Sequence, residues 1–428
     1  MTNTRSIHKA TALVILGALL VSQRSFPQPQ DFPHKYVDYT IETKNAVQPF
    51  AKVDAKAAGI DPAALERLVK RAEETHSDAL VILKDGKLVG DWRFGKPAEP
   101  IEVMSVSKSV ASLAVGNLLY KGKIRSLDEL VSTYLPEWRE GPKKAVTLRH
   151  LLNHTSGLQA NPNAQEVYES KDIVKLALDA GLVKEPGTEF FYNNKAVNLL
   201  GAIVEKASGK KLDEYMRDEV FAPLGITRFS WMRDAAGNPH VMAGAKLDAL
   251  DLAKLGQLML DGGVYQGRRI VSAEWAREAV TAAQSLNPTG GLLWWVVPEW
   301  EKRRFDDELF ETWRQGGADP AFLEKMETFR GKELEMETFL GEMERIFGAG
   351  QGMPAYMMNI RAKGLRGPKT LVGPTLGFNA NGYLGQFIVA LTGPRLVVVR
   401  QIRQESFQSE ADGFAEITKL ARELAPKG

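Results

Sequence analysis

The chain has 428 residues, 44% hydrophobic and 25% charged, which is long enough for about two domains or for one large domain with an insertion. Lys and Arg number 55 against 53 Asp and Glu, and a net charge of +2 argues against nucleic acid as a partner. The absence of cysteine excludes disulfides, thiol nucleophiles and cysteine-based metal sites. Any nucleophile must therefore be an oxygen or a nitrogen.

The first residues have the pattern of an export signal. Arg5, His8 and Lys9 precede an apolar run from Ala10 to Val21 that is too short to span a bilayer. We expect residues 1–24 to be a signal peptide, so that the protein is periplasmic or extracellular and has no stable membrane span after cleavage. A buried N-terminal helix is the alternative interpretation.

Residues 25–52 are rich in Pro, Gln and other polar residues and are expected to form a linker or N-terminal arm before a domain over residues 53–428. Asp61-Pro62 predicts a helix start, and apolar residues at helical spacing continue to about His76. Two β-type runs, residues 79–83 and 87–92, flank Asp85-Gly86 and predict a hairpin.

The middle of the chain favours helices. Residues 103–120 predict a buried helix, and short helices punctuated by Pro and Gly predict a helical lobe over about 125–260. Near the end, residues 386–390 and 396–402 predict a second hairpin, and residues 411–424 predict the last helix. Strands from both ends with helices between them indicate an α/β fold of the α+β type.

Residues from about 300 to 350 differ from the rest because they are charged, rich in Met and prone to helix. Met326-Glu327-Thr328-Phe329 recurs ten residues later as Met336-Glu337-Thr338-Phe339. We interpret this segment as an inserted helical hairpin with a local duplication, which serves as a lid or as surface decoration.

The candidate chemistry begins at Ser105-Val106-Ser107-Lys108, where a helix is expected to start. Residues three apart on a helix share a face, so the hydroxyl and the amine can reach each other. A lysine buried beside an apolar helix has a lowered pKa and can accept the serine proton. The helix N-terminus would also stabilise a developing oxyanion.

A second Ser-x-x-Lys match, Ser208-Gly209-Lys210-Lys211, follows a predicted helix and is interpreted as a solvated helix end with Gly as the cap. Two further segments accompany the first match. They are His150-Leu151-Leu152-Asn153-His154-Thr155-Ser156-Gly157-Leu158 and Tyr192-Asn193-Asn194.

These motifs in this order resemble the serine β-lactamase and penicillin-binding-protein superfamily, on the branch with class C β-lactamases, family VIII esterases and 6-aminohexanoate-dimer hydrolases. The resemblance runs from about Ala79 to Ile402. It implies a two-lobe fold in which an antiparallel sheet flanked by helices adjoins a helical lobe, with the site in the cleft between them.

The resemblance also implies roles for single residues. Ser105 would be the acylated nucleophile, Lys108 its base, and Tyr192 the phenol that relays protons and later activates water. A phenol acts as a base near neutrality only if a cation such as Lys108 stabilises its phenolate. Asn194 would hydrogen-bond to Lys108 or to the substrate.

The third superfamily motif departs from the usual pattern, because Ala380-Asn381-Gly382 stands where Lys-Thr-Gly is typical. By resemblance to the 6-aminohexanoate-hydrolase branch, Gly382 precedes the oxyanion donor, which is the backbone N–H of Tyr383 paired with that of Ser105. Loss of the Lys removes a charged donor for the carboxylate of penicillins. Efficient β-lactam cleavage would then need a substitute such as Arg400 or Arg403.

Trp294 and its neighbour Trp295 are candidates to line an apolar substrate pocket, with packing of the sheet as the equal alternative. His150 and His154 are interpreted as structural, since a Ser-Lys-Tyr site needs no histidine. The six histidines form no metal-ligand spacing, so no metal and no cofactor are expected.

The sequence thus predicts a secreted serine hydrolase that cleaves an ester or amide of a small molecule through an acyl-enzyme on Ser105. A β-lactamase or DD-peptidase is the first alternative. A penicillin-binding-type sensor or binding module without turnover is an alternative of another class.

Overall fold

The computed structural model describes residues 33–42, 47–161 and 164–424, so the expected signal peptide lies outside the described residues. The chain divides into two compact units, one within Val21–Val297 and Leu376–Gly428 and the other comprising Pro298–Thr375. Among the described residues, the helices all fall short of the length and apolar character that a membrane crossing requires.

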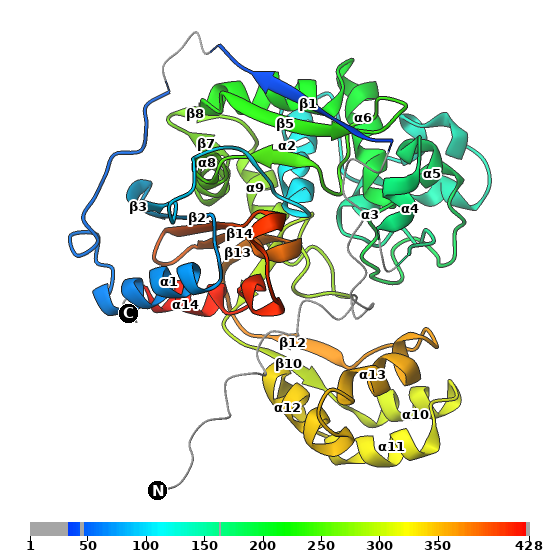
Figure 1. The fold of residues 1–428 in the computed structure, drawn as a ribbon. Coiled ribbons are helices and arrows are strands. Elements are labelled where there is room, and N and C mark those ends of the chain that lie inside the picture. The colour runs from blue at the N-terminus through cyan, green and yellow to red at the C-terminus, as the bar shows by residue number, and fades with distance from the viewer. Residues whose placement is uncertain (1–32, 43–46, 162–163, 425–428) are drawn as a thin grey trace, which may run out of the picture. The chain divides into compact units, whose positions relative to one another are not determined.

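The larger unit is built on a six-stranded sheet of order β3-β2-β15-β14-β13-β9 (Figure 1). Neighbouring strands from β3 through β13 are antiparallel. The sheet joins strands from both ends of the chain, as predicted. The strands are β2 (Ala79–Lys84), β3 (Lys87–Trp92), β9 (Trp295–Pro298), β13 (Thr375–Gly382), β14 (Gln386–Leu391) and β15 (Leu396–Gln401).

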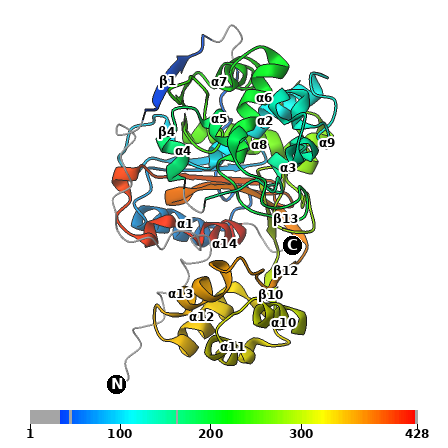
Figure 2. The ribbon, with the colours of Figure 1, turned by 90° about the vertical axis from the view of Figure 1, so that its right-hand side faces the viewer.

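Helices cover both faces of this sheet, as the strand sequences require. In β2, Leu80 and Ile82 pack with α1 (Pro62–Glu74) and α14 (Ile417–Glu423). The alternate residues Ala79, Val81 and Leu83 belong to the core that contains α2 (Val106–Tyr120) and α8 (Ala249–Leu260). Successive strand residues point to opposite faces, so an apolar run such as β2 is buried on both sides. Figure 2 shows the two helix layers on either side of the sheet.

The local signals of the sequence are confirmed at several elements. Asp61 caps α1 by accepting a hydrogen bond from the Ala64 N–H, and both predicted hairpins form. The last helix is shorter than predicted: a 3₁₀ turn occupies Glu410–Gly413, and Phe414 then adopts a left-handed φ of 50°. That backbone conformation interrupts an α-helix, so α14 begins only at Ile417.

The predicted helical lobe contains a second sheet that the sequence did not indicate. This sheet has the order β1-β5-β6-β4, and β5 and β6 lie inside the range expected to be helical. The strands are β1 (Lys35–Thr40), β4 (Ile101–Glu102), β5 (Arg228–Arg233) and β6 (Ala245–Leu247). The helices of the same region are α3 (Leu148–Leu152), α4 (Gln165–Glu169), α5 (Ile173–Asp179), α6 (Leu199–Ser208) and α7 (Leu212–Met216), followed by α9 (Ala273–Ala279).

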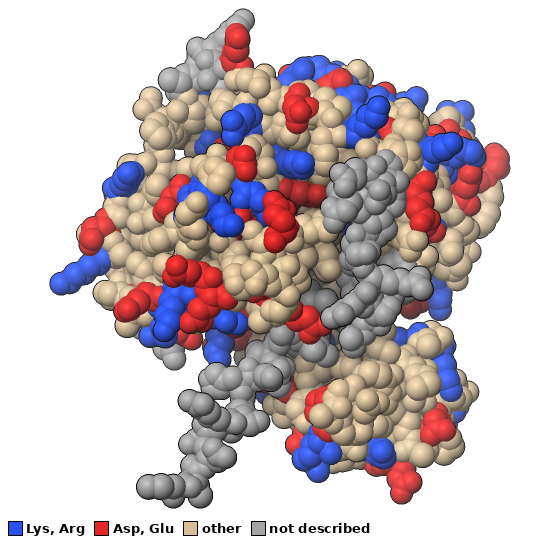
Figure 3. Space-filling view, viewed as in Figure 1, with Lys and Arg blue, Asp and Glu red and all other residues tan. Residues whose placement is uncertain are grey.

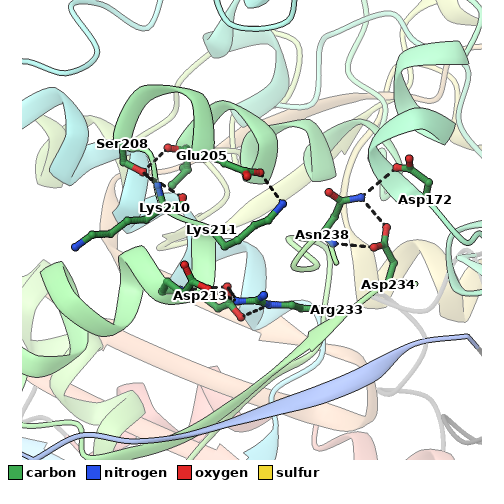
Figure 4. Close-up of polar contacts among 11 residues, drawn as sticks. Asp172, Glu205, Ser208, Lys210, Lys211, Asp213, Arg233, Asp234 and Asn238 are labelled. Carbon is green, nitrogen blue, oxygen red and sulfur yellow. Dashed lines mark hydrogen bonds and ion pairs between the residues drawn. The ribbon is translucent and has the colours of Figure 1, made fainter. Parts of the chain in front are cut away.

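Strand β1 lies within the segment expected as a linker or arm, and a buried carboxylate anchors it. Tyr39 of β1 donates a hydrogen bond to Asp213, and Arg233 of β5 donates two to the same carboxylate (Figure 4). Asp213 is fully buried, so these charge-assisted bonds offset the loss of its hydration.

The smaller unit, Pro298–Thr375, is more than the helical hairpin that the sequence suggested. Besides α10 (Asp307–Gln315), α11 (Pro320–Met326), α12 (Met336–Phe347) and α13 (Gly352–Tyr356), it contains a sheet of order β11-β10-β12. These strands are Glu333–Glu335, Glu301–Arg304 and Lys369–Val372. The repeated motifs each supply a core phenylalanine, and the rings of Phe329 and Phe339 lie 5.3 Å apart.

Positive and negative side chains are mixed on the surface, in agreement with the near-zero net charge. On the face shown in Figure 3, Lys and Arg alternate with Asp and Glu, and neither sign gathers into one extended patch. That face gives no sign of a polyanion-binding surface.

A glycine in α2 controls how closely this central helix packs. A Cβ at Gly116 would lie 2.3 Å from Nε1 of Trp275 in α9, so Gly116→Ala must displace a buried indole. We expect the free energy of unfolding to fall by about 1–3 kcal/mol, as overpacking typically costs. Calorimetric melting checks this, with Gly341→Ala as the control because a Cβ there meets nothing within 4 Å. A Gly116→Ala protein as stable as the wild type would contradict the packing.

Candidate active site

Ser105 lies at the start of the buried helix α2. It is the N-cap residue, and Met104 before it has a left-handed φ of 49°. The Val103 N–H donates to the Ala245 carbonyl of β6, which ties the turn to the second sheet. One helical turn later, Lys108 Nζ lies 3.0 Å from Ser105 Oγ, as the Ser-x-x-Lys spacing predicts.

The Lys108 amine is enclosed by protein. Its residue is 3% exposed, and its Nζ donates a second hydrogen bond, of 2.6 Å, to the Met242 carbonyl. Burial lowers the pKa of Lys108 well below 10.5, because an ammonium loses its hydration there. The Met242 contact is one that sequence reasoning missed, since a carbonyl from a distant segment leaves no signal in a motif.

Tyr192 comes from the loop between α5 and α6, and its phenol donates a 3.1 Å hydrogen bond to Ser105 Oγ. Burial raises the pKa of Tyr192 to about 12, while the Ser105 bond opposes that rise. Lys108 Nζ lies over the ring, 4.9 Å from its centroid. Burial thus favours the protonated phenol, and the expected stabilisation of a phenolate by Lys108 stays a prediction.

The end of β13 lies against the backbone of Ser105. A Cβ added to Gly382 would meet the Val103 carbonyl oxygen at 2.6 Å and the Ser105 nitrogen at 3.1 Å. Only glycine permits this approach. It puts the residue before Tyr383 beside the start of α2, where the expected oxyanion donors would have to meet.

Asn194 and Trp294 are two other predicted site residues. The Asn194 carbonyl accepts a hydrogen bond from the Asn198 side chain, and the expected bond of Asn194 to Lys108 or to the substrate stays a prediction. Trp294 is 1% exposed and donates to Ser112 in the core, so it packs the interior and does not line a pocket.

The tryptophan beside the candidate site is Trp295. Its ring lies 6.1 Å from that of Tyr192 and nearly parallel to it. The two neighbouring tryptophans therefore have different surroundings, Trp294 in the core and Trp295 beside Tyr192.

The two arginines considered as substitutes for the motif lysine bind elsewhere. Arg400 is fully buried and donates to the carbonyls of Leu384 and Gly385 in the turn after Tyr383. Arg403 pairs with Asp78 at 2.5 Å. Both guanidinium groups are thus held by the protein itself.

The second Ser-x-x-Lys match has no such arrangement. Ser208 donates to the Val204 carbonyl, and Lys211 pairs with Glu205 (Figure 4). Gly209 caps α6 with φ of 81°, as predicted. In the described part of the chain, no cluster of His, Asp or Glu suited to a metal is found.

The pKa of Lys108 can be tested through stability. Between the lowered folded-state pKa and 10.5, the unfolded chain binds a proton that the folded protein does not, so stability rises with pH. Lys108→Met lacks this contribution. We expect the wild type to gain stability relative to Lys108→Met as the pH is raised from about 7 toward 10, measured by urea unfolding. If the difference in unfolding free energy between the wild type and Lys108→Met did not change with pH, Lys108 would have the pKa of an ordinary lysine.

Several known proteins have sequences similar to that of this chain. The 6-aminohexanoate-dimer hydrolase of Paenarthrobacter ureafaciens is 28% identical over 284 residues, which cover 58% of this chain and 70% of that protein. Penicillin-binding protein 4* of Bacillus subtilis (strain 168) is 35% identical over 134 residues, 29% of each chain. The chain thus spans less than a third of the length of this second relative.

Solved structures share the fold. EstCE1, described as a hydrolase with promiscuous acyltransferase activity, superposes with a TM-score of 0.52 at 17% identity, covering 85% of this chain and 100% of that one. The model of the family described as Beta-lactamase matches residues 65–298, more than half of the chain. That range includes Ser105, Lys108 and Tyr192. The chain therefore belongs to the beta-lactamase family, within the serine β-lactamase and penicillin-binding-protein superfamily.

Proposed function

We propose that the protein is a serine hydrolase that cleaves an ester or amide bond of a small molecule through an acyl-enzyme on Ser105. One observation carries the proposal: Ser105 Oγ is within hydrogen-bond distance of both a buried amine, Lys108, and a partly buried phenol, Tyr192. A hydroxyl becomes a nucleophile when a neighbouring base can take its proton.

In the proposed reaction, the neutral Lys108 amine takes the proton as Ser105 Oγ attacks the carbonyl carbon. The oxyanion is stabilised by the backbone N–H groups of Ser105 and Tyr383. The protonated Tyr192 gives its proton to the leaving alcohol or amine, and the proton held by Lys108 restores the phenol. Water then attacks the acyl-enzyme, and its proton returns through the same two groups to Ser105.

The chemistry around the site supports a neutral ester or amide over a substrate with a carboxylate. Ala380 and Asn381 replace the cationic motif, and Arg400 and Arg403 are engaged within the protein. The relatives include an amide hydrolase named for 6-aminohexanoate dimer and the hydrolase EstCE1. The penicillin-binding relatives keep a β-lactamase or DD-peptidase, or a sensor without turnover, as the alternatives.

Two covalent probes separate these functions. Protein comprising residues 25–428 is incubated with a fluorophosphonate or with a fluorescent penicillin, and its intact mass is read beside Ser105→Ala. We expect fluorophosphonate labelling that Ser105→Ala abolishes, and little labelling by penicillin, because Ala380 and Asn381 replace the cationic motif and Arg400 and Arg403 are held by other groups of the protein.

Other outcomes change the conclusion. Penicillin labelling that depends on Ser105 would favour the β-lactamase or DD-peptidase. Release of a single equivalent of p-nitrophenol from p-nitrophenyl butyrate, with no steady-state turnover, would favour the sensor. Equal labelling of Ser105→Ala would exclude Ser105 as the nucleophile.

We also propose that the protein is exported. The support is the order of Arg5, His8 and Lys9 before the apolar residues 10–21. Cell fractionation with mass determination of the N-terminus tests this, and an intact Met1 in the cytoplasmic fraction would contradict it.

A further inference from the structure

His154 takes no part in the proposed reaction, but it forms hydrogen bonds with the backbone on both sides of Tyr192. The residue follows α3, has a left-handed φ of 59° and is buried. Its carbonyl accepts a 2.9 Å hydrogen bond from the Phe191 N–H, and its Nδ1 accepts a 3.2 Å bond from the Asn193 N–H. One residue therefore holds the chain immediately before and immediately after Tyr192.

The imidazole also packs on the phenol ring. The ring centroids of His154 and Tyr192 are 4.6 Å apart, and Trp295 stacks within 6.5 Å of His154 at an interplanar angle of 13°. Phe190 meets His154 edge-on at 6.0 Å. These contacts limit the directions in which the Tyr192 ring can move, because aromatic side chains in a packed interior have few alternative rotamers.

The hydrogen bond at Nδ1 decides the tautomer of His154. Since Nδ1 accepts the Asn193 N–H, the ring proton is on Nε2, which is buried without a hydrogen-bond partner. Burial, together with the neighbouring Lys108, lowers the pKa of His154 to about 3. The neutral imidazole is therefore the form that burial favours beside the Lys108 amine.

We infer that His154 is a positioning residue for Tyr192: its carbonyl and Nδ1 hold the backbone on both sides of Tyr192 so that the phenol reaches Ser105. The inference rests on the proposed function, since it assigns His154 through the role of Tyr192. The inference requires that removal of the hydrogen-bond acceptor at Nδ1 lowers the activity. It also requires that this loss of activity arises from displacement of the Tyr192 phenol.

Two variants of His154 differ mainly in whether they offer a hydrogen-bond acceptor near the place of Nδ1. Both His154→Asn and His154→Gly tolerate the left-handed φ, and neither has a ring, but only Asn offers an oxygen near the place of Nδ1. His150→Asn is the matched control. His150 is partly exposed, and its Nδ1 accepts the Thr147 N–H at the start of α3, so it does not touch Tyr192.

The kinetic probe is p-nitrophenyl butyrate. We expect His154→Gly to lower kcat by about 10- to 100-fold with KM changed by less than about threefold, as misplacement of a catalytic group does. His154→Asn should recover most of that loss, and His150→Asn should stay within about twofold of the wild type. In a Tyr192→Phe background, His154→Gly should change kcat by less than about threefold.

Three results would overturn the inference. They are an unchanged kcat in His154→Gly, an equal loss in His154→Asn and His154→Gly, and an equal loss with and without the Tyr192 hydroxyl.

Two readouts are independent of turnover. Crystal structures should show the Tyr192 phenol within hydrogen-bond distance of Ser105 Oγ in His154→Asn and displaced in His154→Gly. If His154→Gly does not fold, nitrogen spectra of histidine-labelled wild type report the tautomer, and a proton on Nδ1 would refute the hydrogen bond. Failure of the proposed function appears separately, as wild-type protein that fluorophosphonate does not label at Ser105.

Discussion

The burial of the Lys108 amine beside Ser105 is the constraint on which the site depends. A charged ammonium in this position would lose its hydration and gain in return two neutral oxygens, the Ser105 hydroxyl and the Met242 carbonyl, and the face of the Tyr192 ring. Burial therefore lowers the pKa of the amine and favours its neutral form, which is the form that can take a proton. In the proposed reaction this neutral amine serves as the base.

Excluding water requires that the helix with this lysine be surrounded, and both sheets contribute. The six-stranded sheet and α8 pack against α2, while β6 and the Met242 segment close over the first turn. The end of β13 then approaches so closely that Gly382 cannot have a side chain. Arg400, buried in the same sheet, bonds to the two carbonyls that follow Tyr383 and so holds the turn in place.

The smaller unit shows how a long segment can be added between two strands of one sheet. Pro298–Thr375 connects β9 to β13, which are neighbours in the six-stranded sheet. It has a core of its own, which includes Phe305, Trp313, Phe329 and Phe339. An insertion with a complete core costs the host sheet little beyond closing the connection.

The sequence by itself determined the features that follow from local geometry. The spacing of Ser105 and Lys108 brings their side chains together on any helix, Asp61-Pro62 starts a helix, and Asp85-Gly86 turns a hairpin. The motifs also sufficed to indicate the family and the α+β fold. Strands β5 and β6 escaped prediction because β6 has only three residues and β5 pairs with β1, which lies far away along the chain.

Only the tertiary structure decided which groups surround the reacting hydroxyl and how they titrate. It brought the Met242 carbonyl to Lys108, placed Trp295 rather than Trp294 beside Tyr192, and bonded the His154 side chain to the backbone of the Tyr192 loop. It also showed that burial raises the pKa of the Tyr192 phenol. The physical reason is that hydrogen bonds between distant segments and the loss of hydration depend on packing in three dimensions, whereas a motif specifies only neighbours along the chain.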